Sequence, residues 1–472
     1  MSPVRRIAFE EWRLMRRDRV AMGGLVLLVL LTVAAAFTAW DQRQAAAAAR
    51  ALHQSQVDQE FDTQPDRHPH RMVHYGHFVF RAPGALAAFD PGVDAFTGHT
   101  LFLEGHRQNS ANFGDVRQSS LLLRFGQLTP AFVLQVLAPL LLIFVGHAAV
   151  ARERESGTLR VLLAQGVRPA QLVAGKALAL GGVAVLVLAP AVIALAAIAW
   201  TTPEQGGPAA VLALAHAAWL AIWVVGITAA STWLPRGRDV LLVLLAAWTA
   251  WVVVVPRLGP ELALARTALP TRFETDIAIA RDLAAIGDSH NPDDPYFAGF
   301  RRQVLARYGV ARIEDLPVNY KGLVGMEGER LTSELFARYA TEAFERQERQ
   351  LAQVDQFAWL SPMVALRRLS MAVAGTDLWQ YRRFVEQAER HRYALVQHLN
   401  RLQAEQLTFR DDKSSRDSRI ASTHWHGAAD FHFEPDPSMR GAASAAGTLL
   451  LWLVALSAVL IVASNRLGKE TR

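Results

Sequence analysis

Six runs of predominantly apolar residues divide the chain. Each run can cross a hydrocarbon core about 30 Å thick as a helix, although the fifth is short and needs residues from its flanks. The predicted transmembrane helices are residues 20–40, 130–150, 172–200, 208–234, 239–255 and 443–464. The pattern therefore predicts a mainly α, polytopic membrane protein with six transmembrane helices.

Two long polar stretches separate these runs, at residues 41–129 and 256–442. Within residues 378–402, apolar positions recur at spacings of three and four and are interrupted by Arg392, which is typical of a helix with a heptad-like seam. An earlier stripe over residues 329–357 predicts a second long helix. We expect the two helices to pack together or to extend as a stalk, within a large, mostly helical domain built from both stretches.

Residues 1–19 carry arginines and apolar side chains at helical spacing, which predicts an amphipathic helix at the membrane surface. Together with the first apolar run, this segment also resembles a secretory signal peptide, with Ala34-Ala35-Ala36 in the place of a cleavage site. We favour an uncleaved anchor, because the run is long for a signal peptide and five more runs follow it.

Lysines and arginines in the short connections predict the orientation of the chain. Basic residues are concentrated in segments 1–19, 151–171, 235–238 and 465–472. The connection that contains Glu204 has no basic residue. We therefore expect both termini in the cytoplasm and both polar stretches on the outside. These basic segments also account for the net charge of +6, so no nucleic-acid partner is predicted.

The connection 151–171 is short, charged and punctuated by glycine. The sequence Glu153-Arg154-Glu155 ends the second apolar run, and the hydroxyls of Ser156 and Thr158 are candidate caps for a new helix beginning near Gly157. Gly166 is suited to end that helix in a left-handed conformation, and Pro169 suits the first turn of the next one.

Three leucines, Leu159, Leu162 and Leu163, form one apolar stripe on this short helix. A leucine stripe outside the bilayer core needs a surface to bury it. We expect that surface to be the lipid interface or a soluble partner. The alternative is a solvated loop beside the membrane with no partner.

The order and spacing of this segment resemble the first cytoplasmic loop of type-2 ABC transporter permeases. The resemblance rests on Glu153-Arg-Glu-Ser-Gly-Thr-Leu159, on Leu162-Leu163 and on Gly175-Lys176. It implies that the loop is a coupling helix, which docks in a groove of a separate ATPase subunit. The implied coupling residues are Glu153, Glu155, Gly157, Thr158, Leu159, Leu162 and Leu163.

A narrower resemblance covers the second polar stretch. Residues 361–377, Arg410-Asp-Asp-Lys413 and His424-Trp-His426 are similar to a subgroup of these permeases with large extracytoplasmic insertions of unknown function. That subgroup includes permeases associated with bacterial gliding motility and with maturation of a copper reductase. The resemblance implies a bacterial inner-membrane protein that works with an ATPase dimer, a second permease chain that is the same or similar, membrane lipid and an additional periplasmic partner.

The sequence contains no recognisable catalytic machinery. Gly175-Lys176 is followed by Ala177 and lacks the upstream glycine of a phosphate-binding loop, and no serine-hydrolase or zinc-protease motif is present. The chain has no cysteine, which excludes disulfides and thiolate chemistry. We therefore expect no enzyme activity and no cofactor on this chain, with ATP and Mg²⁺ bound by the partner ATPase.

Two groups of histidines in the polar stretches are the candidates for metal ligands, because imidazoles bind zinc and copper. The candidates are His68, His70, His74, His424 and His426. No cysteine or clear carboxylate accompanies them, so we favour hydrogen-bonding surface residues and expect no bound metal. Three functions stay open: an ABC permease, an ABC-type mechanotransmitter that acts on a periplasmic partner, and a membrane-anchored protein that handles metal outside the cell.

Overall fold

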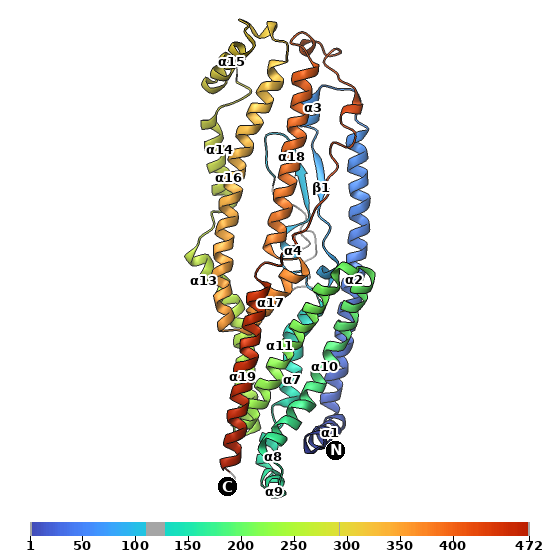
Figure 1. Ribbon diagram of the computed structural model, residues 1–472, viewed down its shortest axis with the longest axis vertical. Helices are drawn as coiled ribbons and strands as arrows, with labels where there is room; N and C mark the ends of the chain where they lie inside the picture. Colours follow the sequence, from blue (N-terminus) through green and yellow to red (C-terminus); the bar gives the residue numbers. More distant parts are fainter. Residues whose placement is uncertain (1, 110–127, 292, 471–472) are drawn as a thin grey trace.

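The computed structural model describes residues 2–109, 128–291 and 293–470 and shows an elongated molecule with two parts (Figure 1). A bundle of apolar helices forms one part. The other, which we call the head, consists of residues 41–109 and 267–441. Both chain ends lie at the end of the bundle that is far from the head (Figure 1). The predicted mainly α, polytopic architecture is confirmed.

Six helical segments among the described residues are long and apolar enough to cross a membrane. They correspond to the six predicted spans, but several continue beyond them. Their elements, preceded by the short helix α1 (Pro3–Arg17), are α2 (Arg19–Asp62), α6–η3–α7–α8 (Pro130–Phe132, Val133–Leu137, Ala138–Gly146, Ala151–Glu155), α10 (Pro169–Thr201), η4–α11 (Pro203–Gln205, Gly206–Trp233), α12–η5–α13 (Gly237–Trp248, Thr249–Val254, Val255–Arg266) and α19 (Ala442–Glu470).

Two of these segments contain π-helical turns, η3 and η5, which free backbone carbonyls from the regular helical ladder. Inside a bilayer such carbonyls need donors from the protein itself. In η3, the carbonyls of Leu134 and Val136 accept hydrogen bonds from the indole N–H groups of Trp219 and Trp248, each at 3.1 Å. Buried Trp219 and half-buried Trp248 therefore stabilise irregular backbone as well as packing in the bundle core.

Helix α1 packs directly on α10. A side chain at Gly175 or Gly182 would collide with Ile7 or Trp12 of α1, at 2.6 and 2.9 Å, so these two glycines allow the close approach of the helices. Phe9 and Leu14 of α1 remain exposed. The predicted amphipathic helix is present, and its buried face contacts protein.

The head is built around helices that continue from the membrane part. Helix α2 has 44 residues, a length of about 66 Å at 1.5 Å per residue, and runs from the bundle along the side of the head (Figure 1). The remaining elements of the head are α3 (Pro69–Val73), β1 (His77–Phe80), η1 (Ala85–Ala88), α4 (Asp94–Thr97), β2 (Thr100–Leu103), α14 (Arg272–Ile286), α15 (Pro295–Tyr308), η6 (Ile313–Asp315), α16 (Tyr320–Gln356), η7 (Phe357–Trp359), α17 (Pro362–Ala374), α18 (Leu378–Gln406), η8 (Asp411–Lys413) and η9 (Ser422–His424).

The two long helices that the sequence predicts, α16 and α18, pack together. Arg392, which interrupts the seam, is buried and pairs with Glu329 of α16 at 2.6 Å and with Glu389 at 2.7 Å. The polar residue in the seam is therefore an ion-paired contact between the helices.

Both polar stretches form a single head. The antiparallel hairpin β1–β2, with His77 opposite Leu103, packs beside α18. Phe61, at the end of α2, shares a buried cluster with Leu399 of α18 and with Trp425. Residues distant in the sequence thus build one core.

Helix α17 joins the head to the bundle. The Ser361 hydroxyl at its start donates a 2.7 Å hydrogen bond to the carbonyl of Trp251 in η5. The indole of Trp452 in α19 donates to the carbonyl of Ala358 at 2.9 Å. These contacts fix the base of the head to two membrane helices.

Candidate functional site: the loop between the second and third spans

The loop lies at the end of the bundle where both termini lie, and it contains the short helix α9 (Thr158–Ala164) (Figure 1). Gly157 precedes α9 with φ +77°, a left-handed conformation that favours glycine. The predicted hydroxyl caps are wrong, because no side chain caps α9. The hydroxyls of Ser156 and Thr158 instead contact each other at 2.8 Å, and Thr158 also donates to the carboxylate of Glu153.

The end of α9 agrees with the sequence prediction. Gly166 has φ +86°, and the N–H of Val167 donates to the carbonyl of Leu162 at 3.1 Å, which closes the helix as in a Schellman motif. Pro169 then begins α10. The connection is therefore a compact, defined turn.

The leucine stripe faces the protein itself, which differs from the expectation. Leu159 is only 3% exposed and packs with Val150, Leu172 and Leu467. Leu162 and Leu163 are half-buried against the same cluster. The sequence cannot distinguish a leucine covered by its own chain from one covered by a partner, since both need burial.

The opposite face of α9 is exposed. It presents Arg160, Val161, Ala164 and Gln165, and Val161 is 55% exposed. An exposed valine between polar residues at a loop tip is a small surface that another protein can cover.

An ion-pair network holds the loop to α1 and α10. Lys176, whose side chain is 2% exposed, contacts Glu153 at 2.6 Å and also pairs with Glu11 of α1. Arg152 approaches Glu11 at 3.0 Å. Since a buried charge needs a partner, Lys176 makes the positions of Glu11 and Glu153 depend on each other.

Arg154 and Glu155 connect the loop to α11 and α12. Arg154 donates to the carbonyls of Thr232 and Leu234, at 2.9 and 2.7 Å, where α11 ends. Glu155 accepts the backbone N–H of Gly237, at the start of α12, at 3.0 Å. The carboxylate and the guanidinium thus complement the partial charges of these two helix ends.

Sequence reasoning missed the roles of Lys176, Glu11 and Ser231. The Ser231 hydroxyl accepts the N–H groups of Val150 and Ala151 at 3.0 and 3.2 Å. A lone lysine within an apolar run was the available signal, because an ionisable residue there requires a specific partner.

The structure divides the histidine candidates. His68 is engaged by Asp412 at 2.7 Å, and its other ring nitrogen accepts the N–H of His70. His424 and His426 flank Trp425 in the second polar stretch, whereas His68, His70 and His74 lie in the first. Among the described residues, the group of potential metal ligands whose donor atoms lie within 4.8 Å of one another is His70, His106 and His290.

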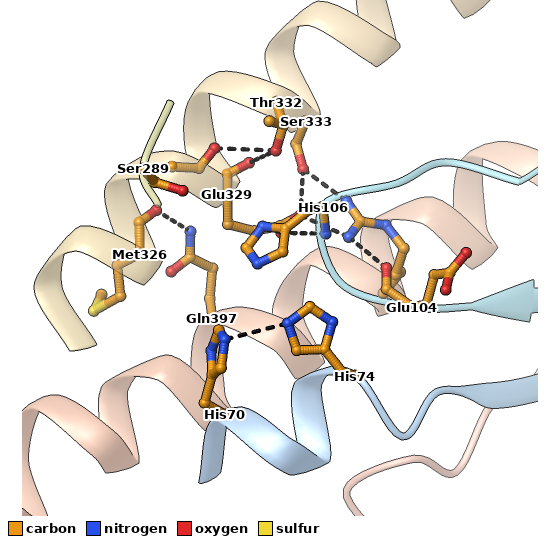
Figure 2. A network of polar contacts seen from close by, with 12 residues as sticks. His70, His74, Glu104, His106, Ser289, Met326, Glu329, Thr332, Ser333 and Gln397 are labelled. Carbon is orange, nitrogen blue, oxygen red and sulfur yellow. Dashed lines mark hydrogen bonds and ion pairs between the residues drawn. The ribbon is translucent and has the colours of Figure 1, made fainter. Parts of the chain in front are cut away.

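His106 is held by Glu329, and Figure 2 shows this contact beside His70 and His74. Burial opposes ionisation of Glu329, but the hydrogen bond from His106 and the charge of Arg392 outweigh it and hold the pKa of Glu329 at about 2. Burial, followed by the neighbouring His74 and His106, lowers the pKa of His70 to about 4.

Two known families match different parts of the chain. Residues 5–273, more than half of the chain, match the family described as ABC-2 family transporter protein. Residues 272–434 match a domain of unknown function, DUF3526. The search of curated proteins gave no match. Five of the six membrane-spanning segments and the loop lie within the first match, most of the head lies within the second, and α19 lies outside both, so this chain belongs to the ABC-2 transporter family as a multi-pass membrane protein with an added helical domain.

Proposed function

We propose that this chain is the membrane subunit of an ABC transporter and that a separate ATPase subunit docks on the exposed face of α9. The observation that carries the proposal is the attachment of the loop: the three consecutive residues Glu153, Arg154 and Glu155 connect α9 to α10, α11 and α12. A displacement of α9 therefore acts on several membrane helices at once.

The proposed contact differs from the simplest form of the coupling model. Leu159 anchors α9 to its own subunit, and the partner covers Arg160, Val161, Ala164 and Gln165. Glu153, Gly157 and Thr158 set the direction of α9, since they form the turn from which it begins.

In this assembly, two permease chains and two ATPase subunits work together, and the ATPases bind ATP and Mg²⁺. The basic loops support a cytoplasmic location of both termini and of α9, and a periplasmic location of the head, in a bacterial inner membrane. The direction of work is outward: export, or force applied to the head.

Co-purification from native membranes tests the docking surface. The tagged permease should bring with it a subunit that hydrolyses ATP. The double variant Arg160→Glu with Val161→Asp should reach the membrane at a normal level but lose that subunit, because charge is placed on the proposed contact. Arg238→Glu is the control: it reverses the charge of an exposed arginine in the first turn of α12, on the same side of the bundle.

The proposal fails if the double variant keeps its ATPase. Loss of the ATPase in both the double variant and Arg238→Glu indicates a general electrostatic effect on this side of the membrane.

A second function, mechanical transmission without transport, is supported by the continuity of α2. This helix passes from the bundle into the head without a break. The buried polar side chains Gln135 and His216 bond to each other at 3.3 Å inside the subunit and are not presented at its surface. A gain of head movement on ATP addition, without uptake or release of any solute, favours this function.

A further inference from the structure

Four histidines from three separate segments converge in the head. His70 and His74 lie one turn apart on and just after α3, His106 follows β2, and His290 lies between α14 and α15. Ring centroids are 4.7 Å apart for His70 and His74, 5.4 Å for His74 and His106, and 5.5 Å for His106 and His290. No single segment of the chain supplies all four histidines.

The nitrogen positions of His70, His106 and His290 lie near those that ligands of one ion require, and His74 adjoins this group through His70. Four nitrogens bound to zinc at 2.0–2.1 Å in a tetrahedron lie about 3.3 Å from one another. The Nε2 atoms of His70 and His74 are 3.2 Å apart (Figure 2). Donor atoms of His70, His106 and His290 lie within 4.8 Å of one another, and the exposed ring of His290 has room to close the remaining distance.

His106 provides an independent indication of a ligand. Its Nδ1 faces Glu329 at 3.3 Å, while its Nε2 is buried without a hydrogen-bond partner. A buried polar atom without a partner is costly, and a metal ion would satisfy it. The contact with Glu329 is the carboxylate–histidine arrangement that orients metal-binding imidazoles.

The backbone supports the same position for His106. This residue has φ +60°, a left-handed backbone conformation that is strained for residues other than glycine. The N–H of His106 donates to Glu329 at 2.9 Å and so holds this conformation. Gly105 allows the turn to approach α3, since a side chain there would lie 2.3 Å from Val73.

We propose that His70, His74, His106 and His290 bind one divalent transition-metal ion that favours imidazole ligands, with zinc as the best fit. Glu329 orients His106, and Asp288, 3.5 Å from Nδ1 of His290, does the same for His290. The ion would tie the connection between α14 and α15 to α3 and to the turn after β2. This inference is independent of the ATPase proposal and replaces the expectation that these histidines bind no metal.

Zinc titration of the full-length purified chain tests the site. The protein carries a tag without histidine, is stripped with a chelator and is then titrated with Zn²⁺, and the bound metal is measured after gel filtration. We expect one zinc per chain and a higher Tm with zinc than without. His290→Ala should reduce the affinity by about 100-fold or more, at least as much as losing an outer-shell contact does.

His290→Ala is the decisive variant, because it changes an exposed loop, whereas His106→Ala also removes a contact with Glu329. The double variant His424→Ala with His426→Ala is the matched control and should bind zinc as the wild-type protein does. Less than about 0.1 zinc per chain in the wild-type protein, or equal affinity in His290→Ala, overturns the proposal.

Discussion

The ion-pair network around Lys176 permits a quantitative prediction for Lys176→Met. The substitution keeps an unbranched side chain of similar length but removes the buried cation between Glu11 and Glu153, whose side chains are 11% and 16% exposed. The more exposed Arg152 stays beside the two acids, 3.0 Å from Glu11. Removing one member of a buried ion pair costs about 3–5 kcal/mol. We expect this cost to appear as opening of the loop, since the network joins the loop to α1 and α10.

The chain has no cysteine, so a single introduced thiol reports the opening. In Leu159→Cys the thiol lies on the buried face of α9, and it reacts with a maleimide only when the loop opens. An opening cost lowered by about 3 kcal/mol corresponds to a labelling rate roughly 100-fold faster, at 1.4 kcal/mol for each factor of ten. The assay measures, in membranes, the labelling rate of Leu159→Cys and that of the double variant Leu159→Cys with Lys176→Met.

Neutralising the two acids tests the assigned cause. Adding Glu11→Gln and Glu153→Gln to Lys176→Met removes the carboxylate charges that have lost Lys176 and should restore most of the slow labelling. A labelling rate within about threefold of the Leu159→Cys background in Lys176→Met alone would refute the reasoning, because the network would then contribute little to holding the loop.

Further predictions concern orientation, the head and its junction with the bundle. A cysteine at half-buried Ser414 should be labelled from outside intact cells, and one at exposed Ser156 only after permeabilisation; labelling of Ser156→Cys from outside contradicts the proposed orientation. Arg392→Met should destabilise the head by about 3–5 kcal/mol in thermal unfolding, because it leaves Glu329 buried without its cation. The pKa of Glu329 is lowered to about 2, so ionisation of Glu329 stabilises the fold above about pH 4.3, and this contribution is lost as the pH falls toward 2. An unfolding temperature that does not change over that pH range in the wild-type protein contradicts the assignment, as does an unfolding temperature that depends on pH equally in Glu329→Gln. Trp452→Phe should loosen the junction by about 1 kcal/mol through loss of the bond to Ala358, seen as a lower unfolding temperature that Trp200→Phe, at an 88% exposed position, does not reproduce.

The sequence was sufficient for the membrane helices and for the long helices of the head, because burial in lipid and in a helical seam both leave periodic apolar patterns. It was also sufficient for the turn at Gly166 and Pro169, which depends on local backbone chemistry. The orientation of the leucine stripe was not predictable. Leu467, which covers Leu159, comes from the far end of the chain.

The histidine group is a second case in which spacing along the sequence did not predict which residues come together. Spacing along the sequence suggested that His68 belongs with His70 and His74, but Asp412 binds His68 instead. His290 joins the group only because α14 packs on α16 and α15 is hydrogen-bonded to α16 through Tyr296 and Glu327. Local spacing predicts which side chains share a helix turn, whereas long-range packing decides which ones share a site.

The shared core of the head has a consequence for the biogenesis of this protein. Trp425 donates a hydrogen bond to the carbonyl of Gln64, 361 positions earlier in the chain, and Phe61 is buried against α18. A ribosome delivers the first stretch long before α18 has been synthesised, so the apolar side chains of Phe61 and Met72 remain uncovered during insertion of four more spans. Maturation of the head therefore has to wait for the last third of the polypeptide, which supplies α18 and Trp425.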